Sequence, residues 1–466
     1  MESFVDRETE LARLQKLYES SAAELAVIFG RRRLGKTALV KESLKEYDTA
    51  ILYQAREKTT KLQLQQFIEI AAKSYPGVDR IRHDWESVLG YLAEKDAIIV
   101  LDEFPYLVSQ DSSLPSIIQA LFDYEFDDSA ATIVLVGSSI SMMEEAALLG
   151  NSPLYGRSSL KLDIQQLPFD AAATFHSPTA TASDLVSAWS VFGGVPYYLE
   201  NCSPNRTLGD NIRHTVLSTH GSLHNEPEYV LRMELTEPVR YFSILEAISG
   251  GNTRRNEISG ATGIAYNQLS KYVNRLSRLR LLTQSVPVTE QKDRSKRSQF
   301  QIQDHFFRFW FRFIYGTGDR YDDFGEGAYE KLIAPHMSDF TSTAFEELSQ
   351  RALRSLYPSH TITDVGGWWY QEHEIDVVGL TSEETLIVGE CKFQNAPLSY
   401  DAFGGLKTHT EALRWTPSTG KERSVEYALF SRSGFTTSVT EIAAERDNVS
   451  LFTVDDVVDA LSSTES

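Results

Sequence analysis

The sequence predicts an α/β protein of several domains, and three observations lead to this fold class. In the first 200 or so residues, short apolar runs rich in β-branched residues alternate with amphipathic stretches, as in strands joined by helices. From about residue 170 to residue 285 only helical periodicity remains. After about residue 336 strand and helix patterns alternate again, and the 466 residues suffice for about three domains.

In the first domain we expect strands at 26–30, 50–54, 97–102 and 132–137, and a helix at 39–47. Each strand candidate is a short apolar run bounded by polar residues, as is typical of strands buried on both faces. Because such strands alternate with amphipathic stretches, we expect one parallel sheet covered by helices.

A phosphate-binding loop lies between the first strand and the helix that follows it. The motif G-x-x-x-x-G-K-[ST] is matched by Gly30, Arg31, Arg32, Arg33, Leu34, Gly35, Lys36 and Thr37. The glycines let the backbone approach phosphates, the lysine neutralises the β- and γ-phosphates, and the threonine hydroxyl ligates Mg²⁺. We therefore expect ATP and Mg²⁺ as cofactors; a fortuitous strand, turn and helix is the alternative.

The ends of two further strands carry polar side chains that suit such a loop. Asp102 ends the strand at 97–102 and is expected to hold the Mg²⁺ shell, and Glu103 could polarise the attacking water. Ser138 follows the strand at 132–137, where its hydroxyl could sense the γ-phosphate. Ordinary turn residues are the alternative interpretation for all three.

The motifs over residues 4 to 200 resemble those of archaeal-type P-loop ATPases related to the AAA+ and STAND NTPases. The resemblance rests on the opening Phe4-Val5-Asp6-Arg7-Glu8, the phosphate loop, Leu101-Asp102-Glu103-Phe104, Gly137-Ser138-Ser139, Pro153-Leu154-Tyr155-Gly156-Arg157 and Gly194-Val195-Pro196. It implies that Arg157 acts as an arginine finger on a neighbouring subunit, and that Pro196 lies in a turn that contacts nucleotide. A structural arginine that caps a helix is the alternative for Arg157.

A basic helical segment follows in a protein that is acidic as a whole. The formal charge of the chain is −20, yet residues 254–312 hold twelve basic and four acidic side chains. Helices expected at 238–249, 255–262 and 265–281, with a strand-turn-strand through 290–303, are typical of a winged helix. Its third helix and its wing offer side chains that suit phosphates and base edges: Asn267, Gln268, Lys271, Arg275, Arg278, Lys292, Arg294, Lys296 and Arg297.

We therefore expect the winged helix to bind double-stranded DNA. A rigid spacer, a protein contact or a solvated, salt-bridged helical face would give the same pattern. The aromatic segment at 306–315 has rings on nearly every face, so a buried helix that fastens the two halves together is favoured over a base-stacking platform or an interfacial helix.

Acidic and basic residues are spaced in the last domain as in a metal-dependent nuclease. Strands are expected at 374–379 and 386–393; along the second, Glu390 and Lys392 share one face while Cys391 points to the other. Asp376 on the neighbouring strand could converge with Glu390 on a divalent cation, and Lys392 could position or activate water. A preceding helix at 341–356 offers Glu346 or Glu347 as a further ligand.

The pattern from 340 to 455 resembles the PD-(D/E)XK restriction-endonuclease-like fold, which is found attached to ATPases of this family. The resemblance implies a deoxyribonuclease-type site. An inactive binding domain or a sheet without function would also account for the spacing, because Glu and Lys two residues apart are a common solvated pair.

These patterns predict an ATPase core at 1–170, a helical lid at 171–235, a winged helix at 236–303, a connecting helix and linker at 304–335 and a nuclease-like α/β domain at 336–466. No apolar run reaches the length of a membrane span, and two distant cysteines, Cys202 and Cys391, exclude a disulfide framework. We expect a soluble, cytoplasmic protein.

The function expected is ATP-dependent action on DNA, with homo-oligomers as a possibility. A STAND-like ATP switch whose last domain only binds partners, or a transcription regulator that uses the winged helix alone, are the alternatives.

Overall fold

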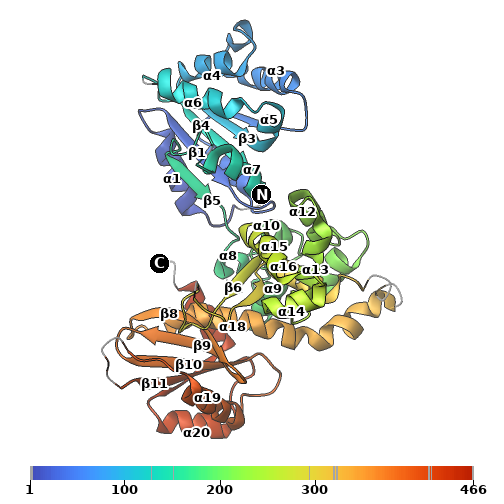
Figure 1. The fold of residues 1–466 in the computed structure, drawn as a ribbon, viewed down its shortest axis with the longest axis vertical. Coiled ribbons are helices and arrows are strands. Elements are labelled where there is room, and N and C mark those ends of the chain that lie inside the picture. Colours follow the sequence, from blue (N-terminus) through green and yellow to red (C-terminus); the bar gives the residue numbers. More distant parts are fainter. Residues whose placement is uncertain are drawn as a thin grey trace. The chain divides into compact units, whose positions relative to one another are not determined.

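The computed structural model describes residues 4–126, 128–150, 152–292, 294–317, 321, 324–417, 420 and 422–463. The chain divides into two compact units, Met1–Leu167 and Pro168–Ser466 (Figure 1). The boundary between the two units lies three residues before the expected end of the ATPase core at residue 170. Within the described residues, no helix is long and apolar enough to cross a membrane.

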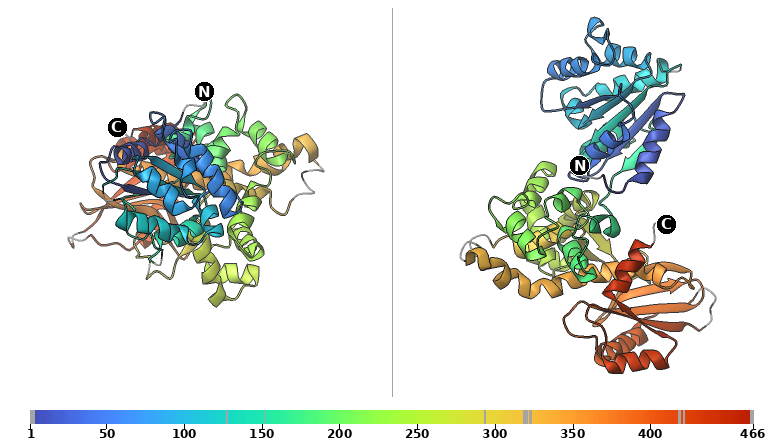
Figure 2. Two further views of the ribbon diagram at one scale, coloured as in Figure 1. Left: turned by 90° about the horizontal axis from the view of Figure 1, so that it is seen from above. Right: turned by 180° about the vertical axis from the view of Figure 1, so that it is seen from behind.

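The first unit is a parallel five-stranded sheet with the strand order β2-β3-β4-β1-β5 and helices on its faces (Figures 1 and 2). Its elements are α1 (Glu8–Tyr18), β1 (Glu24–Phe29), α2 (Lys36–Ser43), β2 (Ile51–Gln54), α3 (Thr60–Ala71), η1 (Val78–Arg80), α4 (Trp85–Ala93), β3 (Ile98–Asp102), α5 (Phe104–Gln110), α6 (Leu114–Tyr124), β4 (Thr132–Gly137), α7 (Ile140–Met143), η2 (Glu144–Leu148) and β5 (Leu160–Asp163).

The four expected strands are present as β1 to β4, and the core lies where their apolar side chains meet the covering helices. The expected helix at 39–47 is α2, which starts three residues earlier because Lys36 and Thr37 already belong to its first turn. The carboxyl ends of β1, β3 and β4 share one edge of the sheet, so the phosphate loop, Asp102 and Ser138 gather at that edge.

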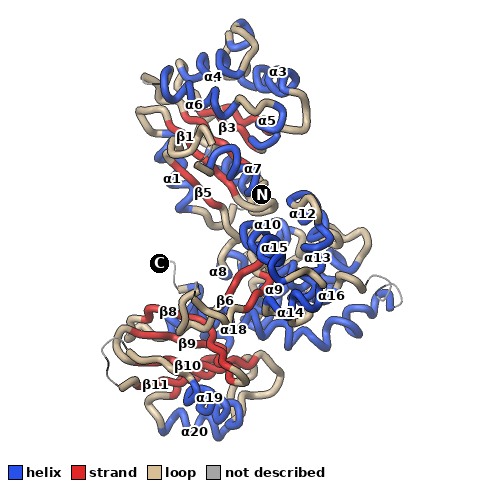
Figure 3. The backbone as a smooth tube through the Cα atoms, viewed as in Figure 1, coloured by secondary structure: helices blue, strands red, loops and turns tan. Residues whose placement is uncertain are grey.

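The second unit begins with helices and contains a three-helix segment with a two-stranded hairpin (Figure 3). Its first elements are α8 (Phe169–Ala173), α9 (Ala182–Phe192), α10 (Pro196–Glu200), α11 (Leu208–Ile212), η3 (Arg213–Leu217), α12 (Glu226–Glu234), α13 (Pro238–Ser249), α14 (Arg255–Thr262), α15 (Tyr266–Arg278), β6 (Leu282–Ser285) and β7 (Gln299–Ile302).

The hairpin differs from the one expected. Its first strand is β6, which pairs antiparallel with β7. Only the second strand, β7, therefore falls within the expected range 290–303. The segment 286–298 between them is the loop, and it carries the basic side chains; Asp293 in this loop lies outside the described residues. A strand placed next to the third helix shares its hydrophobic face, and Leu281 and Leu282 are accordingly buried.

The aromatic segment forms α16 (His305–Phe313), a buried helix as expected. Phe306, Phe307 and Phe309 are fully buried, and the helix packs against α9 and α13. The expected linker at 316–327 is described only in part, because residues 318–320, 322 and 323 lie outside the described ranges. Short turns η4 (Gly325–Gly327), η5 (Tyr329–Ile333) and η6 (Ala334–His336) lead into α18 (Met337–Leu356).

The last part of the second unit is a mixed five-stranded sheet with the order β12-β11-β10-β9-β8. Its elements are β8 (Ile362–Tyr370), β9 (His373–Thr381), β10 (Thr385–Lys392), α19 (Tyr400–Ala412), β11 (Ser424–Ser431), α20 (Thr437–Glu445), β12 (Val449–Thr453) and α21 (Val454–Ser462). The strands β8, β9 and β10 are antiparallel neighbours, whereas β10, β11 and β12 run parallel. The sequence did not predict β8.

The hairpin loop is fastened to β8. The amide of Val288 donates to the carbonyl of Gly367 at 3.0 Å. Arg297 and Trp369 exchange two hydrogen bonds, from Arg297 Nη1 to the Trp369 carbonyl at 3.0 Å and from Trp369 Nε1 to the Arg297 carbonyl at 2.9 Å. The guanidinium of Arg297 also contacts Glu290 and lies over the ring of Tyr370. The loop and the C-terminal sheet therefore form one packed body.

Candidate functional site

The phosphate loop joins β1 to α2, and both of its glycines have a steric role. Gly30 has φ +150°, and a Cβ there would lie 2.5 Å from the carbonyl oxygen of Ile164. Gly35 precedes the helix with φ +82°, a left-handed conformation that favours glycine. Arg33 is also left-handed, with φ +72°. The motif glycines are thus required by the shape of this loop and not only by its ligand.

Lys36 points to the centre of the phosphate loop, and Thr37 points to Asp102. Lys36 is buried, and its Nζ donates to the carbonyls of Gly30 at 2.9 Å and Arg31 at 2.6 Å. Thr37 Oγ1 donates to Asp102 Oδ2 at 2.8 Å. Burial raises the pKa of Asp102, and the hydrogen bond from Thr37 opposes this shift. The structure therefore brings together the two side chains expected to ligate Mg²⁺.

Glu103 and Ser138 are also in contact. Glu103 adopts a left-handed conformation with φ +55° immediately before α5. Its Oε1 accepts a hydrogen bond from Ser138 Oγ at 2.5 Å, and its Oε2 accepts one from the Ser138 amide at 3.4 Å. The two residues directly follow the neighbouring strands β3 and β4, which explains their proximity. The carboxylate expected to polarise water is thus held by the hydroxyl expected to sense phosphate.

The remaining residues of the expected nucleotide site have separate surroundings. Arg31 and Leu34 are buried, and Arg32 Nη2 donates to the Tyr106 hydroxyl at 3.2 Å. Arg157 donates to both carboxylate oxygens of Asp123 on α6 at 2.9 Å, and its side chain is 34% exposed. Pro196 is the first residue of α10, in the second unit.

In the expected DNA-binding module, α15 presents a polar face. Its side chains Leu269, Tyr272 and Val273 are buried, whereas Asn267, Gln268, Lys271 and Arg278 are exposed. The basic loop residues Lys292, Arg294 and Lys296 are also exposed.

Two residues of the expected DNA surface face the protein instead. Arg275 Nη2 donates to the carbonyl of Glu234 at 3.3 Å and is partly buried, which turns it from the exposed face. Arg297 is bound to Glu290 and β8, as described above. Sequence periodicity could not reveal the contacts of Arg275 with Glu234 and of Arg297 with β8, because these partners lie 41 and 72 residues away in the chain.

In the C-terminal sheet, β9 and β10 bring the expected acids to one end of their ladder. The pair Gly389 and Val377 closes the ladder, so Asp376 and Glu390 lie one residue beyond it. Lys392 Nζ contacts Glu390 Oε1 at 2.5 Å, as expected for side chains on one face of a strand. Asp376 Oδ2 accepts a hydrogen bond from the Cys391 amide at 2.8 Å.

The charges of these groups perturb one another. Burial, followed by the charge of Glu390, raises the pKa of Asp376 to about 7. Burial, followed by the charge of Asp376, raises the pKa of Glu346 well above its ordinary value. Although burial favours the neutral amine, the hydrogen bond to Glu390 raises the pKa of Lys392. Crowded carboxylates of this kind are common at functional sites.

The structure separates Glu346 from Glu347, which the sequence left undecided. Glu346 acts electrostatically on Asp376, whereas Glu347 contacts Arg308 Nη1 at 3.0 Å and His305 Nε2 at 3.3 Å. Burial opposes ionisation of Glu347, but Arg308 and His305 outweigh it and hold the pKa of Glu347 well below its ordinary value. Glu347 therefore joins α18 to α16 and does not face the acids.

Glu374 is a further acid near this group. It is exposed, its charge adds to the raised pKa of Glu346 and Asp376, and its carbonyl lies 2.5 Å from His409 Nδ1. The sequence signal was its place in Glu374-Ile375-Asp376, two positions from Asp376 on the same strand face. Among the residues that the structure describes, no three His, Cys, Asp or Glu side chains are placed to hold a metal ion.

Comparison with known proteins gives the class of this protein. A family model described as an ATPase domain predominantly from Archaea matches residues 4–202, and one described as Archaea bacterial proteins of unknown function matches residues 310–404. The Walker-type ATPase PABY2304 of Pyrococcus abyssi has a TM-score of 0.52 at 20% identity, over 66% of this chain and 96% of that one. The ORC2 protein of Aeropyrum pernix has a TM-score of 0.46 at 15% identity, over 69% and 96%. With the loop geometry above, the match to the archaeal ATPase domain and the likeness to the Walker-type ATPase indicate a P-loop ATPase of archaeal type.

A relative that matches most of the chain gives the family. An uncharacterized protein of Methanocaldococcus jannaschii is 32% identical over 386 residues, which are 82% of this chain and 85% of that protein. The chain therefore belongs to the family of this Methanocaldococcus jannaschii protein, and residues 4–202 of the chain match the archaeal-type ATPase domain.

Proposed function

We propose that this ATPase hydrolyses ATP with Mg²⁺ and acts on double-stranded DNA through its second unit. The observation that carries the first part is the geometry at the sheet edge, where Lys36 lies inside the loop and Thr37 contacts Asp102 at 2.8 Å. Hydroxyl and carboxylate oxygens are the donors that Mg²⁺ prefers, so Thr37 and Asp102 would hold it. Bound there, Mg²⁺ would neutralise charge on the β- and γ-phosphates.

The ATPase proposal is tested by phosphate release from wild type, Lys36→Ala and Lys41→Ala. Lys41 is an exposed lysine on the same helix and serves as the matched control. We expect Lys36→Ala to lose about 10²-fold or more in turnover, in line with the loss of a transition-state charge contact, and Lys41→Ala to keep wild-type turnover. Equal turnover in all three proteins would contradict the proposal.

Glu103 is proposed as the group that polarises water, and its contact with Ser138 favours a second candidate function. A carboxylate that already accepts a hydrogen bond from a hydroxyl at 2.5 Å is a weaker base toward the attacking water. Slow turnover with tight retention of nucleotide would follow, as in a STAND-like switch whose C-terminal domain binds partners without cleaving. Single-turnover hydrolysis and the release rate of a fluorescent ADP separate the switch from a continuously cycling ATPase.

Arg157 is proposed to act on the nucleotide of a neighbouring subunit in a homo-oligomer. Its ion pair with Asp123 would have to open for this. Mixing Arg157→Ala with Lys36→Ala tests the idea, because a finger in trans lets two inactive variants restore activity to one mixed interface. An Arg157→Ala protein with wild-type turnover would exclude the role. Pro196 is proposed to contact the nucleotide, which a Pro196→Ala variant tests by its Kd for ATP.

DNA binding is proposed for the exposed face of α15 and the tip of the hairpin loop. Lys271, Arg278 and Lys296 are exposed cations, and Asn267 offers an amide to base edges. We expect Lys271→Ala and Arg278→Ala each to reduce the salt dependence of duplex binding by about one unit of log-log slope. Arg446→Ala removes an exposed arginine far along the chain and is the control. Binding that is independent of salt would contradict the proposal.

A metal-dependent nuclease activity is proposed for the C-terminal sheet, supported by the electrostatic crowding of Glu346, Asp376 and Glu390. Their oxygens suit Mg²⁺, which would supply charge for phosphodiester attack. The raised pKa of Lys392 keeps its amine protonated, so Lys392 would hold a phosphate by its charge and would not act as a base. The chemistry of these donors fits the ion, although among the described residues no three of them are placed to hold it.

The test is cleavage of linear and supercoiled DNA with Mg²⁺ or Mn²⁺, with and without ATP, by wild type, Lys36→Ala and Lys392→Ala. Cleavage that is lost in Lys392→Ala supports the site, and the Lys36→Ala result shows whether ATP controls it. If the wild type hydrolyses ATP but never cuts DNA, the C-terminal domain is a binding module and the switch is the better description.

A further inference from the structure

A cavity of about 360 Å³ in the second unit is lined by side chains of the winged-helix segment, α16 and α18. Its apolar wall includes Ile248, Phe300, Ile302 and Phe340. Sites for small molecules begin at about 300 Å³, so a metabolite-sized molecule fits and a nucleoside triphosphate is too large. No expected site residue lines this cavity.

Two arginines one helical turn apart line the cavity. The side chain of Arg308 is 14% exposed, and its Nη1 is bound to Glu347 at 3.0 Å. Its Nη2 is buried and has no hydrogen-bond partner among the residues that the structure describes. Arg312, four residues on, is exposed and also lines the cavity. A guanidinium N–H that is shielded from water and has no acceptor is unfavourable, so Arg308 would gain a hydrogen bond by turning toward an anion in the cavity, beside Arg312.

The charged residues that line the cavity limit the number of negative charges that a bound ligand can carry. Asp339 on α18 lines the same cavity and is exposed, so it disfavours a ligand with several negative charges. Glu347 already offsets part of the charge of Arg308. The cavity therefore suits a ligand with one negative group, a carboxylate or a phosphodiester, that contacts the two arginines. The apolar body of such a ligand would pack against Phe300 and Phe340.

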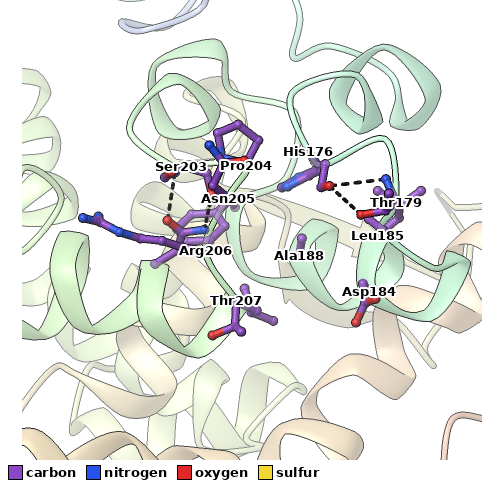
Figure 4. Close-up of a pocket in the computed structure, with 15 residues that line it drawn as sticks. His176, Thr179, Asp184, Leu185, Ala188, Ser203, Pro204, Asn205, Arg206 and Thr207 are labelled. Carbon is purple, nitrogen blue, oxygen red and sulfur yellow. Dashed lines mark hydrogen bonds between the residues drawn. The ribbon is translucent and has the colours of Figure 1, made fainter.

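A second cavity of the same unit does not offer such unmet donors. Figure 4 shows this cavity of about 500 Å³, which lies between α9 and the segment 203–211. The amide of Asn211 is bound at both ends to the backbone of Ser203, at 2.8 and 3.0 Å, and the Ser177 hydroxyl is bound to Thr179 at 2.9 Å. Its one arginine, Arg206, is exposed.

We propose that the cavity beside Arg308 and Arg312 binds a small organic monoanion with an apolar body. Because its walls come from the winged-helix segment and from α18, a bound anion would stabilise the contact between these parts. The proposal is independent of ATP hydrolysis and of DNA cleavage.

The experiment uses the full chain with saturating ADP and Mg²⁺ and two probes that are monoanions at neutral pH, benzoate and methyl phenyl phosphate, with benzyl alcohol as the neutral control. Binding is measured by calorimetry and located by hydrogen exchange. We expect slower exchange at 248–253 and 339–343, no effect of benzyl alcohol, and a preference for one probe that tells carboxylate from phosphate. Arg312→Gln should weaken binding about tenfold, as for the loss of one charge-assisted hydrogen bond.

Two further variants make the result decisive. Thr343→Met fills the cavity from α18 without changing the charge of the cavity and should abolish binding of the probes. Arg206→Gln, in the cavity of Figure 4, should not weaken that binding. Affinity that is unchanged in Arg312→Gln and Thr343→Met, slower exchange only at 30–37, or a loss confined to Arg206→Gln would each overturn the proposal.

Discussion

Replacing Asp376 by asparagine is expected to stabilise the C-terminal sheet in the absence of metal, and more so as pH rises. The pKa of Asp376 is about 7 in the folded protein, against roughly 3.9 in an unfolded chain. The folded protein thus binds this proton more tightly. The stabilisation that this tighter proton binding contributes is complete below the pKa of Asp376 in the unfolded chain, and it is lost as pH rises toward the pKa in the folded protein.

The size of the effect follows from the two pKa values. A shift of about three units at roughly 1.4 kcal/mol per unit gives an upper value of about 4 kcal/mol at pH 8. Because the charge of Asp376 and the titration of Glu346 act on one another, a range of about 2 to 4 kcal/mol is expected. At pH 4 the gain should vanish. Asparagine keeps the acceptor for the Cys391 amide, so this hydrogen bond is retained.

The assay is native-state hydrogen exchange of the peptides that span β9 and β10, in EDTA at pH 6 and pH 8, corrected for intrinsic exchange rates. A local readout is needed because a chain of two units need not unfold in one step. Asp364→Asn changes an exposed acid of β8 and should alter stability by less than about 0.5 kcal/mol. A destabilised Asp376→Asn protein, or a gain independent of pH, would refute the reasoning.

Three further results are expected. Arg308→Met should destabilise the second unit by roughly 1 to 3 kcal/mol, because it leaves the partly buried Glu347 with His305 as its remaining partner, and the double variant Arg308→Met/Glu347→Leu should recover most of the loss in thermal unfolding. Cys202 and Cys391 should resist a thiol reagent until the protein unfolds, since both are buried and burial raises the pKa of Cys202 to about 12. Arg297→Ala should leave the salt dependence of DNA binding unchanged but speed hydrogen exchange in β8.

The sequence pattern correctly predicted those strands and helices whose ends carry strong start and stop signals. The strand at 132–137 and the helices at 238–249 and 255–262 match β4, α13 and α14 at both ends. In each case an apolar run stops at glycine, proline or a polar cap, which fixes its limits. The phosphate loop was predictable for the same reason, because its glycines, lysine and threonine are adjacent in sequence.

Sequence could not decide which neighbour a side chain meets across a long distance. Glu346 and Glu347 differ by one position on α18, and only the approach of Arg308 from α16 assigns Glu347 to an ion pair. Arg297 carries the same charge as Lys296, but β8 holds one of them and leaves the other exposed. Such choices depend on tertiary contacts that periodicity does not record.

The contacts of the hairpin loop with β8 also bear on how the chain folds as it is synthesised. The first unit is complete once Leu167 has emerged, and its sheet can form at once. The second unit must wait, since Arg297 bonds Trp369, 72 residues later, and Ser190 on α9 bonds Thr341, 151 residues later. Contacts this distant slow folding, so the basic loop and the aromatic helix stay exposed on the ribosome until the last third of the chain arrives.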